Sequence, residues 1–362
     1  MVKVLYVITG LGKGGAERQL YYLIKNLPKG YEAKVCAFVD GYFSEKIRSL
    51  GVEVRILKGG LSAFGEFKGI LDEFKPDIVH SWLTHANLFC KISKVFLRQN
   101  YIQISCIRAK DIGDLHYNFL ERLLDPLGDK IAVNAYTTKN FLLRYFAFNP
   151  KKIEVIYNGF EDVVSKNRNI KKELGLEGKK IITTVANFRK QKDYPTNIKT
   201  AIELLKKRDD FAFIYVGEGR EQKKVEGLIS KSGVSGHIKL VGSRNDVPEI
   251  LRASDIFFLP TLYEGQSNVL IEAMRHKCPI LTTDIPENSE IIANGKEGLL
   301  VERGQAEKMA EMIDGLLNNK ALSKKIAQEA FKKSEKLFSN KIMAKKYISL
   351  YQDTIKENRI SK

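Results

Sequence analysis

The chain alternates short apolar runs with longer segments that mix apolar and charged residues at helical spacing. Apolar runs of this length, each followed by a loop, predict buried strands, and the segments between them predict helices. In the first part of the chain the expected strands are 3–9, 34–39, 52–57, 77–82, 101–107 and 130–135. Strands that alternate with helices favour a parallel sheet with helices on both faces.

A second cycle of the same pattern begins near residue 180. Its expected strands are 180–188, 211–217, 237–242, 254–260 and 278–284. The segment between the cycles, roughly 157–172, is polar and contains the turn pair Asn158-Gly159, so we place a linker there. The tail from about 306 to 359 is rich in Ala, Lys, Glu and Leu and is expected to be helical.

The two cycles predict an α/β protein made of two Rossmann-like, doubly wound parallel-sheet domains, and 362 residues suit two domains of ordinary size. We expect the N-terminal domain at 1–160 and the C-terminal domain at 161–339, with a final helix of about 340–362 packing back on the first domain. Tandem domains of this kind imply a cleft faced by the carboxyl ends of both sheets. Because ligands of open α/β sheets bind at those ends, function is sought in the loops that follow strands.

The composition indicates the class of protein and the compartment in which it is expected. Apolar residues at 44% and charged residues at 28% are typical of a soluble globular chain. No apolar run is long enough to span a membrane, and the first residues are expected to form a strand rather than a signal peptide. The four cysteines and five histidines are dispersed without metal-ligand spacing, which favours a reducing, cytoplasmic location and no metal site.

The net charge of +17 is shared almost evenly by the two halves of the chain. Nucleic-acid binders more often gather such charge in one stripe or tail, so nucleic acid is not an expected partner. Spread charge fits solubility, an anionic membrane surface or a polyanionic substrate equally well.

A glycine-rich segment follows the first expected strand and opens a helix. Gly10, Gly12 and Gly15 satisfy the spacing GxGxxG, and glycines there let backbone amides approach a phosphate at a helix N-terminus. Asp40 ends the second expected strand, where a ribose-binding acid of a dinucleotide site would lie. The pattern indicates an anion site more firmly than NAD, and a tight turn without ligand stays open.

Two carboxylates follow the expected strand 254–260. Glu264 lies in the loop and Glu272 about two turns into the next helix, so both can face the cleft. Carboxylates accept hydrogen bonds from vicinal diols, so the pair suits two sugars, such as a ribose and a hexose. Gly265 and the first amides of the helix suit a phosphate between them.

The segment 264–272 (EGQSNVLIE) resembles the E-x7-E motif of the retaining glycosyltransferases of family 4, which have the GT-B fold and include many bacterial cell-envelope polysaccharide enzymes. Other segments resemble that family in the same order along nearly the whole chain. They are GKGGAERQL, PDIVHSWLTHANL, VIYNGFE, ANFRKQKD, YVGEGR and SDIFFLPTLYEGQSNVLIEAMRHKCPILTTD. The resemblance implies a transferase acting from a nucleotide sugar, with a donor-binding C-terminal domain and an acceptor-binding N-terminal domain.

Matching positions imply roles for individual residues. Glu272 is expected to bind the ribose, Glu264 the donor sugar, and Lys192 the diphosphate, where its charge polarises the leaving group. Arg189 stands two residues after Asn187, the position at which many relatives have arginine. The implied donor set is Gly14, Gly15, Asn187, Arg189, Lys192, Gly217, Val241, Arg244, Glu264, Gly265, Gln266, Ser267, Asn268, Val269 and Glu272.

One position departs from the family pattern. After the strand 101–107 many relatives carry a histidine, whereas this chain has Arg108, which can steady a diphosphate or an anionic acceptor but cannot act as a general base. Glu264, Lys192 and Arg108 are therefore the expected catalytic residues. His80, His85 and Arg108 are the expected acceptor side, although a core position fits a lone histidine equally well.

The resemblance implies retention of anomeric configuration, and no second carboxylate is evidently placed as a nucleophile. Lysine and arginine can neutralise a diphosphate, and the chain has no DxD motif, so neither a metal nor a cofactor is expected. UDP-sugars are the favoured donors, and a glycan or lipid-linked acceptor in polysaccharide, lipopolysaccharide or glycolipid synthesis is expected.

Aromatic and cationic residues mix in two helical segments, 85–98 and 141–148. Such faces suit either the core of a wound domain or peripheral contact with the inner face of the cytoplasmic membrane. Two other functions stay open. A nucleotide-sugar epimerase of similar architecture would bind the same ligand, and an NAD-dependent oxidoreductase would explain the glycine loop and Asp40 alone.

Overall fold

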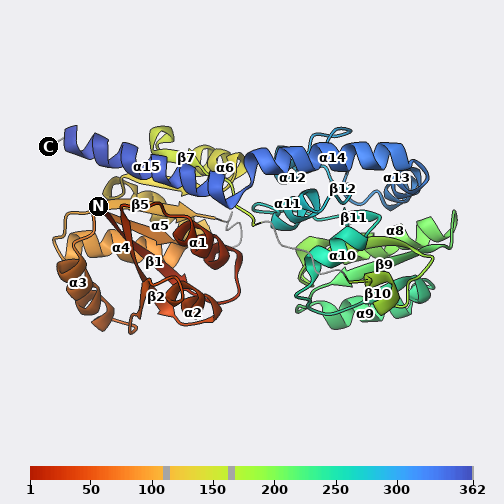
Figure 1. Cartoon of the computed structure of the whole chain (residues 1–362), viewed down its shortest axis with the longest axis horizontal. Coiled ribbons are helices and arrows are strands. Elements are labelled where there is room, and N and C mark those ends of the chain that lie inside the picture. The colour runs from red at the N-terminus through yellow and green to blue at the C-terminus, as the bar shows by residue number, and fades with distance from the viewer. Residues whose placement is uncertain (109–114, 162–167, 361–362) are drawn as a thin grey trace. The chain divides into compact units, whose positions relative to one another are not determined.

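The computed structural model describes residues 1–108, 115–161 and 168–360. The chain forms two compact units, one taking Met1–Phe160 together with the chain from Phe338 onward, the other taking Glu161–Leu337. Each unit has its own parallel sheet with helices packed on it (Figure 1). We call them the first and the second unit.

The sheet of the first unit has seven strands in the order β3-β2-β1-β4-β5-β6-β7, and every pair is parallel. Pairing is continuous through the centre, where Val4 lies opposite both Ala33 and Ile78. The strands are β1 (Val2–Gly10), β2 (Tyr31–Val39), β3 (Glu53–Ile56), β4 (Ile78–Trp82), β5 (Ile102–Ile107), β6 (Lys130–Val133) and β7 (Ile153–Val155).

Helices cover both faces of this sheet because alternate residues of a strand point to opposite sides. In β1, Val4 and Tyr6 join the apolar cluster under the first and last helices, whereas Leu5 and Val7 join the cluster under α3 and α4. The helices are α1 (Gly15–Lys25), α2 (Tyr42–Arg48), α3 (Ser62–Phe74), α4 (Thr84–Phe96), α5 (Leu115–Leu123), α6 (Tyr136–Phe146) and α15 (Asn340–Ile360), with 3-10 turns η1 (Asp125–Leu127) and η2 (Pro150–Lys152).

The C-terminal helix α15 belongs to the core of the first unit. Its Tyr347 and Tyr351 are completely buried, and it packs against α1 and β5. The hydroxyl of Tyr351 lies 2.7 Å from Nδ1 of His80 and 3.3 Å from the hydroxyl of Tyr6. A helix distant in sequence therefore completes the layer over β1 and β4.

The second unit has six parallel strands in the order β10-β9-β8-β11-β12-β13. They are β8 (Lys180–Val185), β9 (Phe211–Val216), β10 (Ile238–Leu240), β11 (Ile256–Leu259), β12 (Ile280–Thr283) and β13 (Leu299–Val301). The helices are α7 (Ile170–Glu173), α8 (Tyr194–Leu205), α9 (Gln222–Ser230), α10 (Val247–Ala253), α11 (Asn268–Arg275), α12 (Pro286–Ile291), α13 (Ala306–Asn318) and α14 (Lys320–Leu337), with turns η3 (Lys190–Lys192) and η4 (Ser235–His237).

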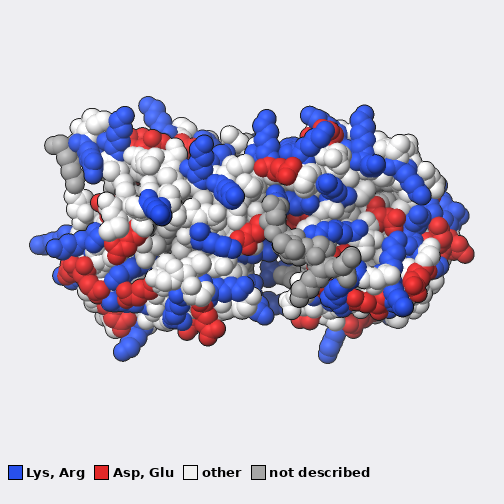
Figure 2. Space-filling view, viewed as in Figure 1, with Lys and Arg blue, Asp and Glu red and all other residues white. Residues whose placement is uncertain are grey.

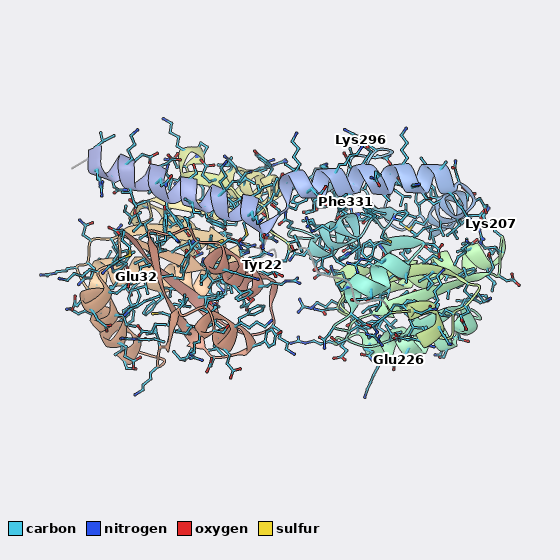
Figure 3. The ribbon with its side chains drawn as sticks, viewed as in Figure 1. Tyr22, Glu32, Lys207, Glu226, Lys296 and Phe331 are labelled. Atoms are coloured by element: carbon cyan, nitrogen blue, oxygen red, sulfur yellow. The ribbon has the colours of Figure 1, made fainter. Side chains whose placement is uncertain are left out.

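A cation–aromatic contact helps to hold the long helix α14 in the second unit. The ammonium group of Lys277, which follows α11, lies 4.4 Å from the centre of the Phe331 ring on α14, the residue labelled in Figure 3. Such contacts add attraction between a cation and the face of a ring. Helix α11, whose N-terminus is part of the candidate site, is thus braced from its other end.

The predicted fold class is confirmed: both units are doubly wound parallel sheets. Each sheet also contains one short strand that the sequence pattern did not predict, β7 and β13, of three residues each. The expected linker, 157–172, falls partly on residues 162–167, outside the described residues. Of the rest, Phe160 is bridged to Ser339, and α7 lies in the second unit.

Candidate active site

The glycine segment 10–15 joins β1 to α1 in the first unit. Gly14 is the N-cap of α1, with extended backbone, and the carboxylate of Glu17 folds back over it. A Cβ on Gly41 would lie 2.7 Å from the carbonyl oxygen of Leu11, so the loop after β2 packs directly on this segment. Burial raises the pKa of Glu17, while a backbone hydrogen bond and the charge of Arg108 act in the opposite direction.

Arg108 stands at the carboxyl end of β5, where β4 also ends. Its guanidinium lies 4.9 Å from the centre of the Trp82 ring and donates to the Sγ of Cys106 at 3.6 Å and to the side-chain oxygen of Asn158. Asn134 donates to the Arg108 carbonyl at 3.2 Å. Arg108 is therefore held by contacts from its own strand β5 and from three other segments of the first unit.

The segment that contains Asn158 is itself fixed to the first unit. Gln19, buried on α1, donates to the carbonyl oxygen of Gly159 at 2.9 Å and accepts from its amide at 2.7 Å. A Cβ on Gly159 would lie 2.5 Å from the Cα of Asn340. The sequence predicted a turn at Asn158-Gly159, within the family-like segment VIYNGFE, but nothing in that segment indicates that the Asn158 side chain binds an arginine.

The two histidines of the expected acceptor side have different positions. His80 is completely buried among Tyr6, Trp82, Tyr347 and Tyr351, so it has no surface through which to contact an acceptor. Burial lowers the pKa of His80 to about 3, and the charge of Arg108 acts in the same direction. The imidazole is therefore neutral over the physiological range.

His85 is exposed at the first turn of α4. Its ring lies 5.1 Å from that of Tyr117 on α5, and the ring of Tyr117 lies 4.2 Å from that of His116. Tyr117 and His116 were not among the expected site residues, since neither belongs to a motif. Three polar aromatic rings thus meet at the N-terminal ends of α4 and α5.

In the second unit the loops after β8 and β9 pack tightly on each other. Gly217 has φ +141, and a Cβ there would lie 2.2 Å from the carbonyl oxygen of Ala186, so only glycine fits. Asn187 and Arg189 are exposed and, with Lys190, Gly219 and Arg220, line an open groove of about 830 Å³. The position expected to carry arginine and the arginine two residues later therefore border the same groove.

Lys192 and Glu264 form an ion pair at the centre of the second unit's candidate site. Nζ of Lys192 lies 2.5 Å from Oε1 of Glu264, and the two side chains are 13% and 7% exposed. The backbone carbonyl of Gln191 accepts from the amide of Leu262 at 2.8 Å and from the hydroxyl of Thr261 at 2.9 Å. These bonds tie the loop that carries Lys192 to the loop that carries Glu264. Two segments about seventy residues apart in sequence therefore meet at this pair.

Helix α11 follows directly after this pair. Gly265 and Gln266 are half-buried, Ser267 is the N-cap, and Asn268 and Val269 form the first turn. The hydroxyl of Ser267 is buried and makes no hydrogen bond to any residue that the structure describes. Glu272 is half-buried in the second turn of the helix. Amides at a helix N-terminus attract an anion, so this turn is a natural phosphate position beside the ion pair.

Two other expected donor residues lie next to β10. Val241 is half-buried just after the strand, and Arg244 makes a two-pronged contact with Asp246 at 2.7 and 2.6 Å. The carboxylate of Asp246 also receives Arg168 at 2.7 Å. The charge of Arg244 is thus compensated within the second unit, and its role in donor binding stays a prediction.

Positively charged side chains and possible metal ligands are both dispersed over the part of the molecule that is seen and described. Lys and Arg side chains are spread over the visible faces of both units, without one basic stripe (Figure 2). Across residues 1–108, 115–161 and 168–360, no three His, Cys, Asp or Glu side chains come together as a metal-binding group. Over the same residues, none of the helices combines the length and hydropathy that crossing a bilayer requires.

Known proteins resemble this chain along most of its length. The capsular polysaccharide biosynthesis glycosyltransferase CapH of Staphylococcus aureus is 27% identical over 306 residues, which cover 80% of this chain and 84% of that protein. A Campylobacter jejuni enzyme named N-acetylgalactosamine-N,N'-diacetylbacillosaminyl-diphospho-undecaprenol 4-alpha-N-acetylgalactosaminyltransferase is 24% identical over 349 residues, covering 91% of this chain and 94% of that enzyme.

The fold is also that of solved structures. Anabaena HepE in complex with UDP superposes with a TM-score of 0.87 at 17% identity, covering 97% of this chain and all of that one. The family model described as Glycosyltransferase Family 4 matches residues 13–162, and the one described as Glycosyl transferases group 1 matches residues 165–333. Between them the two matches cover most of both units, and the chain belongs to the family 4 glycosyltransferases, enzymes of the GT-B fold.

Proposed function

We propose that this glycosyltransferase moves a sugar from a nucleotide sugar, with UDP as the favoured nucleotide, to a glycan or lipid-linked acceptor in the synthesis of a polysaccharide or glycolipid. The observation that carries the proposal is the Lys192–Glu264 pair, in which the carboxylate is buried and the lysine half-buried, in the loop that leads into α11. Opposite charges next to a helix N-terminus in sequence suit a ligand with both a diphosphate and hydroxyl groups.

The donor can be matched to these residues group by group. Lys192 and the α11 amides would hold the diphosphate, Glu264 would accept hydrogen bonds from sugar hydroxyls, and Glu272 would bind the ribose. Arg189, on the rim of the neighbouring groove, would supply a second positive charge. Because these cations neutralise the leaving diphosphate, we propose that the reaction needs no divalent metal.

We further propose that the anomeric configuration is retained. The bond between the sugar's anomeric carbon and the diphosphate oxygen would break, the acceptor oxygen would attack the same face, and its proton would pass to the departing phosphate. Arg108 would stabilise charge in this step, since an arginine cannot accept the proton. Trapping a covalent sugar–enzyme intermediate, or finding an inverted product, would contradict this route.

The names of relatives support the donor and acceptor classes. Anabaena HepE is solved with UDP and with UDP-glucose. An Escherichia coli relative, 23% identical, is named UDP-Gal:alpha-D-GlcNAc-diphosphoundecaprenol alpha-1,3-galactosyltransferase. An acceptor of that class is anchored in a membrane, so we propose that this enzyme is cytoplasmic and works peripherally at the inner membrane face.

Melting shifts across a panel of nucleotide sugars test the donor assignment. A UDP-sugar should raise the melting temperature more than a GDP-, ADP- or CMP-sugar, and excess EDTA should leave both the shift and the turnover unchanged. A shift with NAD alone would instead favour the oxidoreductase. Conversion of a nucleotide sugar to its epimer without any acceptor would favour the epimerase.

A further inference from the structure

Helices α4 and α5 of the first unit present large apolar side chains to the solvent. Sixteen large hydrophobic side chains are exposed among the described residues; six of them lie on these two helices, and a seventh lies just before α3. Their exposed fractions run from 39% for Leu120 to 84% for Leu61. The seven are Leu61, Ile92, Val95, Phe96, Phe119, Leu120 and Leu123, and we call them the α3–α5 face.

The α3–α5 face is continuous because α4 lies between its two neighbours (Figure 1). On one side Phe96 contacts Phe64 of α3, with ring centres 5.3 Å apart. On the other side α4 packs on α5, and Val95 is one turn beyond Lys91, which reaches α5. The spacing 92, 95, 96 on α4 and 119, 120, 123 on α5 gives each helix one apolar side.

The exposed sides of α4 and α5 carry no acidic charge, whereas α3 has two exposed carboxylates, Asp72 and Glu73, and Asp72 accepts from Gln99 at 3.3 Å. Neither α4 nor α5 has a carboxylate except Glu121, which is buried and lies 2.6 Å from the ammonium group of Lys91, also buried. The pair locks the two helices together and leaves cations at the rim, where Arg122 is half-buried and Arg98 is exposed. An exposed apolar face with cations and no exposed carboxylate on these two helices is complementary to an anionic lipid surface.

We infer that the α3–α5 face is a membrane-docking surface, whose apolar side chains enter the interface of a bilayer while Arg98 and Arg122 contact anionic headgroups. The inference rests on the proposed function only for its purpose, which is to bring the enzyme to a lipid-linked acceptor. His85, His116 and Tyr117 lie at the N-terminal ends of the same two helices. When the face is docked, the lipid part of an amphipathic acceptor would lie among the apolar side chains, and its glycan would reach the three polar rings.

Sedimentation with lipid vesicles tests the surface directly. The wild-type chain should bind vesicles of phosphatidylcholine with phosphatidylglycerol, and much less those of phosphatidylcholine alone. Phe96→Ser with Phe119→Ser should weaken binding at least about tenfold, since each removes a large apolar group from the interface. The matched control is Tyr136→Ser with Tyr145→Ser on α6, whose exposed fractions of 55% and 64% are similar, and it should bind like the wild type.

The charge contribution has its own matched pair of variants. Arg98→Gln with Arg122→Gln should weaken binding to the anionic vesicles by about an order of magnitude. The weaker binding to vesicles of phosphatidylcholine alone should not change. Lys223→Gln with Lys231→Gln, two exposed lysines of the second unit, lowers the net charge equally and should have little effect. Equal losses in both pairs would show that only net charge matters and would overturn the surface.

Failure of the surface can be told apart from failure of the proposed function. The Phe96 and Phe119 double variant should keep the wild-type melting temperature, the shift with a UDP-sugar and turnover of a water-soluble, short-chain acceptor, while it loses turnover of a vesicle-embedded one. Equal turnover of the embedded acceptor by both proteins would contradict membrane docking. Loss of a dimer in light scattering, with vesicle binding unchanged, would assign the face to a second copy of the chain instead.

Discussion

At the scale of single residues, the Lys192–Glu264 pair concentrates opposite charges where little water reaches. Removing one partner of a buried pair leaves the other charge uncompensated, which costs far more than removing both. Lys192→Met should therefore lower the free energy of unfolding by about 2 kcal/mol, and Lys192→Met with Glu264→Gln should recover most of that loss. Urea titrations of the three proteins measure the cycle.

The same cycle separates stability from chemistry. The double variant should be stable yet inactive, because the diphosphate loses its cation and the sugar loses its acceptor for hydrogen bonds. Turnover that returned together with stability would show that the pair is structural only.

Glu264 and Glu272 are predicted to do different work. Glu272→Gln should weaken binding of UDP and of the UDP-sugar alike, whereas Glu264→Gln should lower kcat about a hundredfold or more with little effect on UDP affinity. Calorimetric titration with UDP, beside steady-state kinetics, measures both quantities. An equal loss of UDP affinity in the two variants would contradict this division.

The contacts of Arg108 lead to a prediction for Asn158, which the sequence did not single out. Asn158→Ala removes the side-chain acceptor of the guanidinium and should lower kcat about tenfold with donor KM nearly unchanged. Asn158→Asp restores an acceptor and should recover part of the rate. If both variants lose only stability, Asn158 does not position Arg108 for the reaction.

At the scale of elements, the pattern of apolar runs in the sequence predicts most of the strands of the fold. The short apolar runs form strands because they are buried on both faces of a parallel sheet. Strands β7 and β13 were missed, and length alone does not explain this, because the equally short edge strand β10 was predicted. The site could be predicted as far as motifs reach. The burial of His80 depends on α15, about 270 residues away in sequence, and no local pattern contains that contact.

Glycines at the site provide a test of how closely its loops pack. Gly217→Ala should lower the free energy of unfolding by about 2 kcal/mol or more, because its φ is positive and a Cβ would meet the Ala186 carbonyl. Gly227→Ala, inside α9 with nothing near its Cβ position, should instead stabilise by about 0.5–1 kcal/mol. Thermal unfolding of both variants checks the contrast, and a neutral Gly217→Ala would mean that these loops are not fixed as described.

At the scale of the whole molecule, buried neutral histidines make stability depend on pH. The pKa values of His80 and His276 are lowered by burial to about 3 and about 4, so the unfolded chain binds protons that the folded chain does not. Their contribution is complete above pH ~6.5 and is lost as the pH falls below that value, at up to ~1.4 kcal/mol per pH unit for each histidine.

His80→Gln should therefore make the fall in stability between neutral pH and pH ~5 less steep, because the unfolded variant no longer takes up a proton at this position. His276→Gln is the comparison, with a smaller effect expected since this side chain is less buried. Melting temperatures across the pH range measure both. An unchanged slope in His80→Gln would show that the imidazole is protonated in the folded chain.

The central claim is that this chain is a transferase that needs both a nucleotide sugar and an acceptor. The most direct measurement follows UDP release and sugar incorporation at the same time, from a labelled UDP-sugar, with and without an undecaprenyl diphosphate-linked glycan. We predict one UDP released for each sugar incorporated, and almost no UDP released when the acceptor is absent. Equal UDP release with and without the acceptor, or a chemically altered nucleotide sugar with no glycan extended, would contradict the account.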